Sequence, residues 1–242
     1  MIPVITLLAS GFWMLMIFDC VRNDPERNTW LWILIFLNVP GAVIYFVVRR
    51  LPYLNVPVPT AFKRWTYGNK IWDAEAAAKN IGNAHQYVTL GNLLTESGQH
   101  NKALNAYEQA LAQEPKNIHA LWGIASLHVA QGQHQAAKPY LEKLLKQDMD
   151  YKFGEASLMY GTILVALEEW AEAKQHLQDD IKRWSHPEAS LMLAKVQIQD
   201  GESKAAQENL ESMMFKLKAS PRFHYRRKHH LFRQAQRLLK SL

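Results

Sequence analysis

A spacing of 34 residues recurs between Ala84 and Asp150, and it constrains the fold more than any other feature of this chain. In the first copy, small and apolar residues stand at Tyr87, Leu90, Gly91, Leu94, Gly98, Ala103, Tyr107, Ala110 and Pro115. Their counterparts 34 residues later are Leu121, Ile124, Ala125, His128, Gly132, Ala137, Leu141, Leu144 and Met149. A period of this length predicts stacked helical pairs, none of which buries its apolar face alone. We therefore expect a protein that presents a surface rather than a catalytic pocket.

The first copy resembles the tetratricopeptide repeat. That family has a large apolar residue before a Leu-Gly pair, another after it, and then small, aromatic, small and proline positions. All of these places are matched, by Tyr87, Leu90, Gly91, Leu94, Ala103, Tyr107, Ala110 and Pro115. Gly91 and Ala103 would lie where two antiparallel helices cross, because larger side chains would push the helices apart. The resemblance implies a groove for a protein partner, lined by the first helix of each pair.

Two weaker copies follow. The third comes after two extra residues and contains Tyr160, Gly161, Leu164, Ala173 and Leu177; the fourth contains Leu193, Ala194, Gly201, Ala206, Leu210 and Met213. Asp180 and Gln197 depart from the pattern. An irregular bundle would not explain small residues spaced by 34, 36 and 33, at Gly91, Ala125, Gly161 and Ala194. We expect a repeat domain at 73–220, with a leading helix at 73–80 and repeats at about 84–117, 118–151, 154–187 and 187–220.

Residues 1–50 are of a different kind. Residues 1–18 and 30–48 contain no charged side chain, and a helix over the second stretch would be about 28 Å long against a hydrocarbon core of roughly 30 Å. A polar turn at 19–29, with Asp24-Pro25, separates the two stretches. The sequence predicts a transmembrane helical hairpin at 1–50, followed by a juxtamembrane linker at 51–72.

Two other interpretations of the apolar stretches fit less well. A cleaved signal peptide would have a basic start and a cleavage site of small residues, yet no Lys or Arg precedes Arg22. A buried soluble helix would explain Pro40 and Gly41, but membrane helices tolerate both residues. Aromatic residues also stand near the ends of the second stretch, as in membrane interfaces. The membrane interpretation is therefore preferred.

A second resemblance concerns the same region. The run from Trp32 to Ile35, then Pro40-Gly41, Tyr45 and Arg49-Arg50, resembles the two-helix segment that precedes phospholipase D-type cardiolipin synthases. It implies a membrane anchor only, since the His-x-Lys-x4-Asp motif of those enzymes is absent. The whole layout is similar to that of bacterial tetratricopeptide proteins with a membrane hairpin, which implies the bacterial inner membrane and no defined activity.

The positive charge is concentrated at the C-terminal end. The chain has a net charge of +6, while residues 221–242 alone carry seven Lys and Arg residues and no acid. Apolar residues interleave with the basic ones at helical spacing. We expect a basic capping helix at 221–242 that covers the last repeat, with Arg226, Arg227 and Lys228 as candidate contacts for anionic lipid. Nucleic-acid binding is not expected, because no nucleic-acid motif accompanies the patch.

Enzymatic and metal-binding motifs are missing from the sequence. The single cysteine, Cys20, excludes an intrachain disulfide and a multi-cysteine metal site. The histidines lack metal-ligand spacing, and the chain has neither a P-loop nor a nucleophile elbow. We predict no catalytic residue, no metal and no cofactor.

The predicted function is that of a membrane-anchored adaptor whose repeats bind a protein partner in a concave groove. Beside Val88, Val129 and Leu158, the groove residues are expected to be His85, Asn92, Thr95, His119, Trp122, Ser126, Thr162 and Lys195. Trp122 could instead only pack against a neighbouring helix. The alternative function is an accessory or assembly subunit of an inner-membrane complex, bound partly through small residues of the hairpin, Gly11, Gly41 and Ala42. Basic residues after the second stretch place both termini in the cytoplasm.

Overall fold

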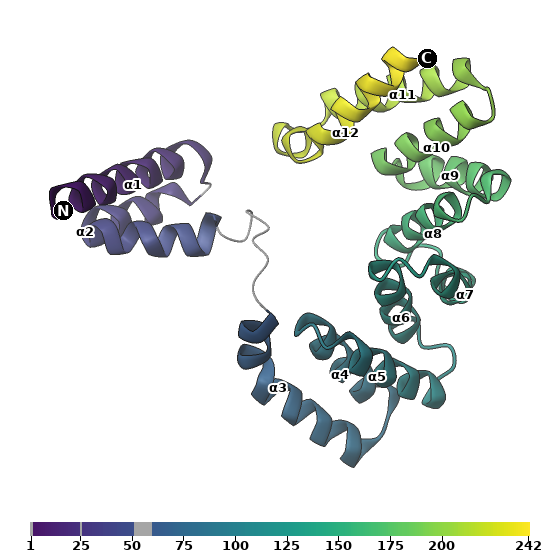
Figure 1. Cartoon of the computed structure of the whole chain (residues 1–242), viewed down its shortest axis with the longest axis horizontal. Helices are drawn as coiled ribbons and strands as arrows, with labels where there is room; N and C mark the ends of the chain where they lie inside the picture. The colour runs from purple at the N-terminus through teal and green to yellow at the C-terminus, as the bar shows by residue number, and fades with distance from the viewer. Residues whose placement is uncertain (1, 25, 51–59) are drawn as a thin grey trace. The chain divides into compact units, whose positions relative to one another are not determined.

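The computed structural model describes residues 2–24, 26–50 and 60–242. The chain divides into two compact units, Met1–Pro59 and Thr60–Leu242. Both units are built from helices, and no strand occurs among the described residues (Figure 1). The all-α prediction is therefore confirmed.

The first unit is a helical hairpin. Helix α1 (Ile2–Asn23) packs against α2 (Arg27–Tyr45), which continues into a π-helical turn, η1 (Phe46–Arg50). The indole Nε1 of Trp13 donates a hydrogen bond of 2.8 Å to the carbonyl oxygen of Leu34 and so ties α1 to α2.

Helix α2 is kinked near its middle. Asn38 has φ 50° and ψ −124°, outside the helical region, and Pro40 follows two residues later. A Cβ atom on Gly41 would lie 2.6 Å from the carbonyl oxygen of Ile33, so a larger residue cannot occupy this position without a backbone shift. Gly41 is therefore required by the fold of α2 itself.

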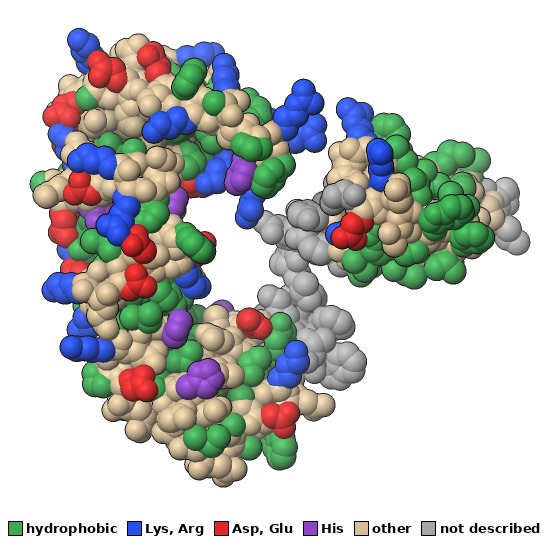
Figure 2. Space-filling model, turned by 180° about the vertical axis from the view of Figure 1, so that it is seen from behind, with side chains coloured by type: hydrophobic (Ala, Val, Ile, Leu, Met, Phe, Trp, Pro, Cys, Tyr) green, Lys and Arg blue, Asp and Glu red, His purple; other side chains and the backbone are tan. Residues whose placement is uncertain are grey.

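The outer surface of the first unit is apolar. The stretch Arg27–Arg49 has 23 residues and a mean hydropathy of 2.3, and only 22% of its most apolar part is buried within the protein. Large apolar side chains such as Trp32, Phe36 and Val43 are exposed, and Figure 2 shows hydrophobic side chains over most of this unit. Among the described residues this is the one stretch long and apolar enough to cross a membrane. Of the two predicted spans, the structure thus supports the second.

The second unit is a solenoid of helical hairpins (Figure 1). Its helices are α3 (Thr60–Ile81), α4 (Ala84–Glu96), α5 (His100–Gln113), α6 (Ile118–Ala130), α7 (His134–Leu145), α8 (Glu155–Ala166), α9 (Trp170–Trp184), α10 (Pro187–Gln199), α11 (Ser203–Ala219) and α12 (Arg222–Ser241). Consecutive helices pack against each other along the unit, and so do the first helices α4 with α6 and α8 with α10. The stacked helical pairs predicted from the 34-residue period are present.

Equivalent residues end and start the helices of successive pairs. Asn83 caps α4 by accepting a hydrogen bond of 3.0 Å from the amide of Gln86, and Asn117 caps α6 in the same way with Ala120. The turn inside each pair contains one residue with a left-handed backbone, at Gly98, Gly132, Glu168 and Gly201. The repeat in the sequence is thus a repeat of caps and turns as well as of apolar contacts.

Tyr107 is the central side chain of the first pair. Its ring is 2% exposed and lies between two glycines. A Cβ atom on Gly91 of α4 would lie 2.5 Å from this ring, and one on Gly123 of α6 would lie 2.4 Å from it. Gly91 was expected to permit close packing, whereas Gly123 lies outside the repeat pattern and was not singled out.

Three features differ from the sequence-based expectation. Residues 60–72, predicted as linker, form the first half of α3, and residues 51–59 lie outside the described residues. Val88, expected in the groove, is 7% exposed, because it packs in the core formed by α3, α4 and α5. Asp180, a departure from the pattern, is 1% exposed and accepts a hydrogen bond of 2.9 Å from Nδ1 of His186.

Helix α12 covers the end of the solenoid. Its residues Leu231, Phe232 and Ala235 are buried against Leu210 and Met213 of α11. Apart from the half-buried Lys228, the basic side chains of α12 stand at exposed positions, and Figure 2 shows Lys and Arg protruding from this end of the repeat unit. The helix thus joins an apolar packing face to a basic surface.

Candidate protein-binding groove

The candidate groove residues lie on the first helix of each pair, α4, α6, α8 and α10. In Figure 1, α6 and α8 lie on the inner side of the curve of the solenoid, and α7 lies on the outer side. His85, Asn92, His119, Thr162 and Lys195 are exposed, while Thr95, Trp122 and Ser126 are half-buried. All eight predicted residues therefore retain accessible surface along one row of helices.

Asn92 is held by the buried tyrosine of its own pair. The hydroxyl of Tyr107 donates to Oδ1 of Asn92 over 2.8 Å and lies 3.3 Å from the hydroxyl of Thr95. Thr95 in turn donates to the carbonyl oxygen of Gly91. Burial raises the pKa of Tyr107, so this hydroxyl stays protonated and remains a donor. The side-chain nitrogen of Asn92 is then free to donate a hydrogen bond to a ligand, for example to a peptide carbonyl.

Trp122 lies beside the junction between the second and third repeats. Its ring centroid is 5.7 Å from that of Tyr151, and the Nζ atom of Lys152 lies 4.6 Å above it. Nδ1 of His119 is 2.9 Å from the hydroxyl of Tyr151. Packing against neighbours, the other interpretation of Trp122, is thus present: the ring packs against the helical core of the repeats as well as against this loop. Because Trp122 remains half-buried, part of its ring stays accessible.

This loop owes its shape to the two extra residues before the third repeat. Lys152, Phe153 and Gly154 have φ values of 51°, 55° and 83°, a left-handed run in which two residues are not glycine. Phe153 is 91% exposed. The loop is held at its start by Asp150, whose carboxylate accepts two hydrogen bonds, of 2.7 and 2.6 Å, from Arg183. Tyr151, Lys152 and Phe153 are here called the junction platform; the first two contact the ring of Trp122, and the third is exposed in the same loop.

The other candidate residues are less organised. The hydroxyl of Thr162 donates to the carbonyl of Leu158 within its own helix. The hydroxyl oxygen of Ser126 is buried and has no hydrogen-bond partner among the described residues. The sequence identified these positions by register alone. It missed Tyr151 and Lys152, and it gave Tyr107 a packing position without predicting that its hydroxyl holds Asn92. The 36-residue spacing was the signal that could have pointed to the junction platform.

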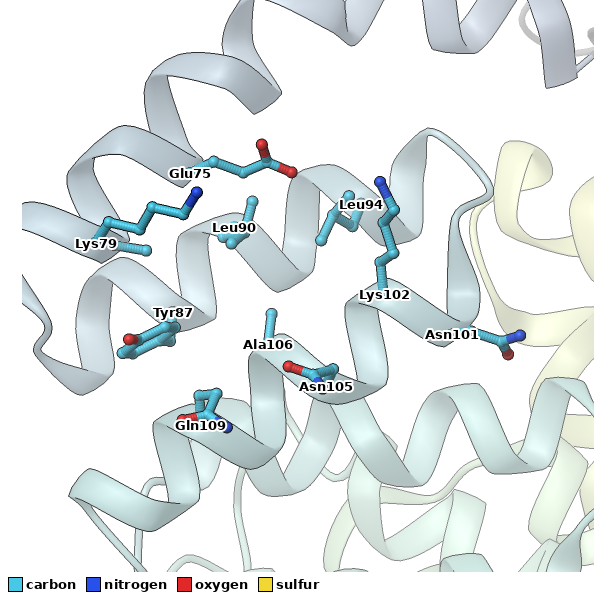
Figure 3. A pocket seen from close by; sticks show the side chains of 11 residues that line it. Glu75, Lys79, Tyr87, Leu90, Leu94, Asn101, Lys102, Asn105, Ala106 and Gln109 are labelled. Atoms are coloured by element: carbon cyan, nitrogen blue, oxygen red, sulfur yellow. The ribbon is translucent and has the colours of Figure 1, made fainter.

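A cavity of about 540 Å³ lies at the other end of the solenoid, between α3, α4 and α5 (Figure 3). Tyr87, Leu90, Leu94 and Ala106 form its apolar side. Polar side chains surround these, among them Glu75, Lys79, Lys102, Asn105 and Gln109. In size the cavity falls within the range of small-molecule and peptide side-chain sites. The sequence did not predict it, because the length of α3 was underestimated.

The three basic residues proposed to contact lipid do not share one environment. Arg226 and Arg227 are exposed, whereas Lys228 is half-buried and its Nζ atom lies 3.0 Å from a carboxylate oxygen of Glu188. Lys228 is therefore partly engaged inside the protein, and the two arginines remain the accessible part of the predicted lipid contact.

Family models match two parts of the chain. Residues 94–152 and 128–183 match the tetratricopeptide repeat model, and residues 11–50 match the Phospholipase D-nuclease N-terminal model. No catalytic family is indicated by these matches. The first resemblance falls on the helical pairs and the second on the N-terminal hairpin.

Known proteins with related sequence or structure agree with this assignment. The uncharacterized protein ycf37 of Guillardia theta is 30% identical over 106 residues, which are 43% of this chain and 58% of that protein. The chain thus matches little more than half the length of this curated relative. MamA from Desulfovibrio magneticus RS-1 superposes with a TM-score of 0.57 at 14% identity, over 66% of this chain and 90% of that structure. YrrB, described as a TPR protein with an unusual peptide-binding site, superposes with a TM-score of 0.54 at 22% identity, over 68% and 90%.

The structural likenesses show the fold, and the family matches locate it in the sequence. Both fall on the helical pairs of the second unit, and no catalytic family is among the matches. Residues 94–183 of this chain thus match the tetratricopeptide repeat, and its N-terminal hairpin is similar to the Phospholipase D-nuclease N-terminal segment.

Proposed function

We propose that this protein is a membrane-anchored adaptor that binds an extended segment of a partner protein along the first helices of its repeats. The observation that carries the proposal is that the same row of helices bears two suitable side chains. One is Asn92, positioned by Tyr107, and the other is Trp122, whose accessible ring lies beside the junction platform. A fixed amide binds a peptide backbone, and an aromatic ring on a rigid helix provides an apolar anchor.

The surface around Trp122 suits a peptide that brings an apolar or aromatic side chain. Tyr151 and Lys152 hold the indole in place, so little side-chain entropy is lost when a ligand packs on it. Phe153, 91% exposed, adds a second aromatic side chain in the same loop. YrrB, a protein of this fold, has a peptide-binding site, and this supports a peptide as the ligand here.

Membrane anchoring is the second part of the proposal. The apolar exterior of α2 and the match of residues 11–50 to a family segment support it. We propose that α1 crosses the membrane with α2, because residues 1–18 are free of charge. Five Lys and Arg residues follow the second span, at positions 49, 50, 63, 64 and 70, against Arg22 and Arg27 in the turn. Such an excess favours a cytoplasmic repeat domain with both termini in the cytoplasm of a bacterial cell.

A photo-crosslinking experiment in intact membranes tests the groove. A photoreactive residue is placed at His119 or Thr162, and at the exposed Gln135 of α7 as a comparison. We expect a protein crosslink from the groove positions and not from Gln135. The crosslink should disappear in the double variant Asn92→Ala, Trp122→Ala.

The matched control is the double variant Gln113→Ala, Phe215→Ala, which removes an exposed amide and an exposed aromatic ring elsewhere. It should leave the crosslink unchanged, and both double variants should remain in the membrane fraction. Equal crosslinking in the two double variants would contradict the groove as the binding surface.

The alternative, an accessory subunit bound through its membrane helices, depends on small residues that face outward. Gly41 and Ala42 are buried inside the hairpin, and Gly41 is required by the kink. Gly11 is exposed, with no described atom within 4 Å of an added Cβ. A photoreactive residue at Gly11 that crosslinks to a membrane protein, with no crosslink from the groove, would favour this alternative.

A further inference from the structure

A second cavity, of about 210 Å³, lies between α10, α11 and α12. Pro187 and Ser190 line it from the start of α10, and Ser185 lines it from the turn before that helix. Lys216 and Lys228 line it from α11 and α12. The cavity is smaller than sites for drug-sized molecules, which are about 300–1,000 Å³. It therefore has room for one small chemical group rather than for a peptide or a nucleotide.

The charge around this cavity is positive. Lys216 makes no ion pair with a described carboxylate, while Lys228 is paired with Glu188 at 3.0 Å. His224 also lines the cavity. The two charged side chains that line the cavity, Lys216 and Lys228, are thus both cationic. An anion entering the cavity would meet Lys216 directly and would compete with Glu188 for Lys228.

Ser190 provides an independent indication of a ligand. Its side chain lines the cavity and the residue is only 6% exposed, yet no described residue hydrogen-bonds to its hydroxyl. Its hydroxyl oxygen keeps accessible surface, so it is free to donate to a group inside the cavity. A hydroxyl and two ammonium groups are donors that bind phosphate oxygens.

We propose that this cavity binds a phosphate group, presented either by free phosphate or by the headgroup of an anionic phospholipid. The tetrahedral group has enough acceptor oxygens to reach donors from three helices at once. Met213 and Leu217, also in the wall, would contact a carbon chain attached to the phosphate. The site contains none of the groove residues, so phosphate binding can be tested independently of the proposed peptide binding.

Binding of inorganic phosphate to the full chain in detergent micelles tests the site. Phosphate is titrated at constant ionic strength set with chloride and followed by ³¹P relaxation. Lys216→Met should weaken binding at least tenfold, because it removes the unpaired ammonium. Ser190→Ala should weaken binding several-fold, because it removes the free hydroxyl. The matched controls, Lys218→Met and Ser212→Ala, change exposed residues of α11 outside the cavity and should bind as the wild type does.

A second titration, with dioctanoyl phosphatidic acid and dioctanoyl phosphatidylcholine, distinguishes the two sources of phosphate. Binding of phosphatidic acid that falls in the same two variants identifies a lipid headgroup. Binding of inorganic phosphate alone identifies a soluble source. The proposal is overturned if the wild type binds neither inorganic phosphate nor phosphatidic acid saturably, or if the cavity variants bind as tightly as the controls. Lys216 is exposed, so Lys216→Met keeps the test valid even if Ser190→Ala fails to fold.

Discussion

The two junctions that follow the first and second repeats are built from related sequences but do different things. At the first, the chain leaves α5, and Asn117 caps α6 within a strict 34-residue period. At the second, two extra residues produce a left-handed run that projects Lys152 over Trp122 and leaves Phe153 in solvent. The regular junction only connects two packed helices, whereas the irregular junction adds exposed side chains next to the groove. In a repeat protein, departures from the period are therefore candidate binding features.

The junctions also differ on the outer side of the solenoid. At the second, Lys138 of α7 contacts Glu169 and Glu172 at α9, and the hydroxyl of Tyr160 donates to Glu172 over 2.5 Å. The position 34 residues before Lys138 is Leu104, so the first junction has no equivalent lysine. The first junction relies on glycine and tyrosine packing, and the second adds an ionic network.

The largest effect is expected where packing alone holds a junction. Gly123→Leu should force α6 away from the ring of Tyr107, and Gly91→Leu should do the same from α4, each lowering the free energy of unfolding by about 1–3 kcal/mol. Urea unfolding of the full chain in detergent measures this loss. Ala136→Leu, at an exposed position of α7, is the control and should change little. Unchanged stability of both glycine variants would refute the packing role of Tyr107.

The next prediction compares the loss of stability at a glycine of the second junction with the loss at a glycine of a regular turn. At Gly154 the backbone is left-handed, and an added Cβ would lie 2.5 Å from the ring of Trp184; at Gly132 the backbone is also left-handed, but no described atom lies within 4 Å. Gly132→Ala should cost about 1–2 kcal/mol from backbone strain alone. Gly154→Ala should cost more, because it adds a steric clash. Equal losses in urea unfolding would show that the contact with Trp184 places no constraint on the junction.

The ionic network should make the second junction sensitive to acid. The hydrogen bond from Tyr160, with help from Lys138, holds the pKa of Glu172 below its ordinary value. Since this carboxyl binds protons less readily in the folded state, its stabilising effect is present above the ordinary glutamate pKa and is lost as the pH falls through the lowered value. The stability difference between wild type and Glu172→Gln should therefore be present at pH 6 and shrink at pH 3.

The control for this pH comparison is Glu208→Gln, at an exposed position of α11. Its stability difference from the wild type should be small at both pH values. A difference for Glu172→Gln that stays constant between pH 6 and pH 3 would contradict the role assigned to the network.

The smallest effect concerns the cation above the indole. Lys152→Met keeps an unbranched side chain over Trp122 but removes the charge, and it should destabilise the folded state by roughly 0.5–1 kcal/mol. If the platform only positions the ring, crosslinking from His119 should persist in this variant. Trp122→Ala should abolish that crosslinking while leaving the repeats folded. Loss of crosslinking in Lys152→Met as well would assign the ammonium a direct role in binding.

The sequence predicted those features that depend on positions within one repeat. Gly91, Tyr107 and the turn glycines follow from the period, and so does the row of first helices that bears Asn92 and Trp122. It could not predict Gly123 as a contact of Tyr107, because that contact joins two repeats and Gly123 lies outside the pattern. Asp180 looked like a weakened position until the structure placed His186 beside it, six residues on and beyond the end of its helix. The junction platform could not be predicted either, because its contacts with Trp122 join residues outside the repeat pattern.

The solenoid has a mechanical consequence. In the described part of the second unit, helices that pack strongly are never more than two apart in the chain, so no strong packing ties α3 directly to α12. The curvature of such an array is the sum of small rotations between neighbours. Because these rotations add along the array, fixing the rotation at one junction changes the distance between the two ends. A partner held across the second junction would therefore change the distance between the two ends of the repeat unit.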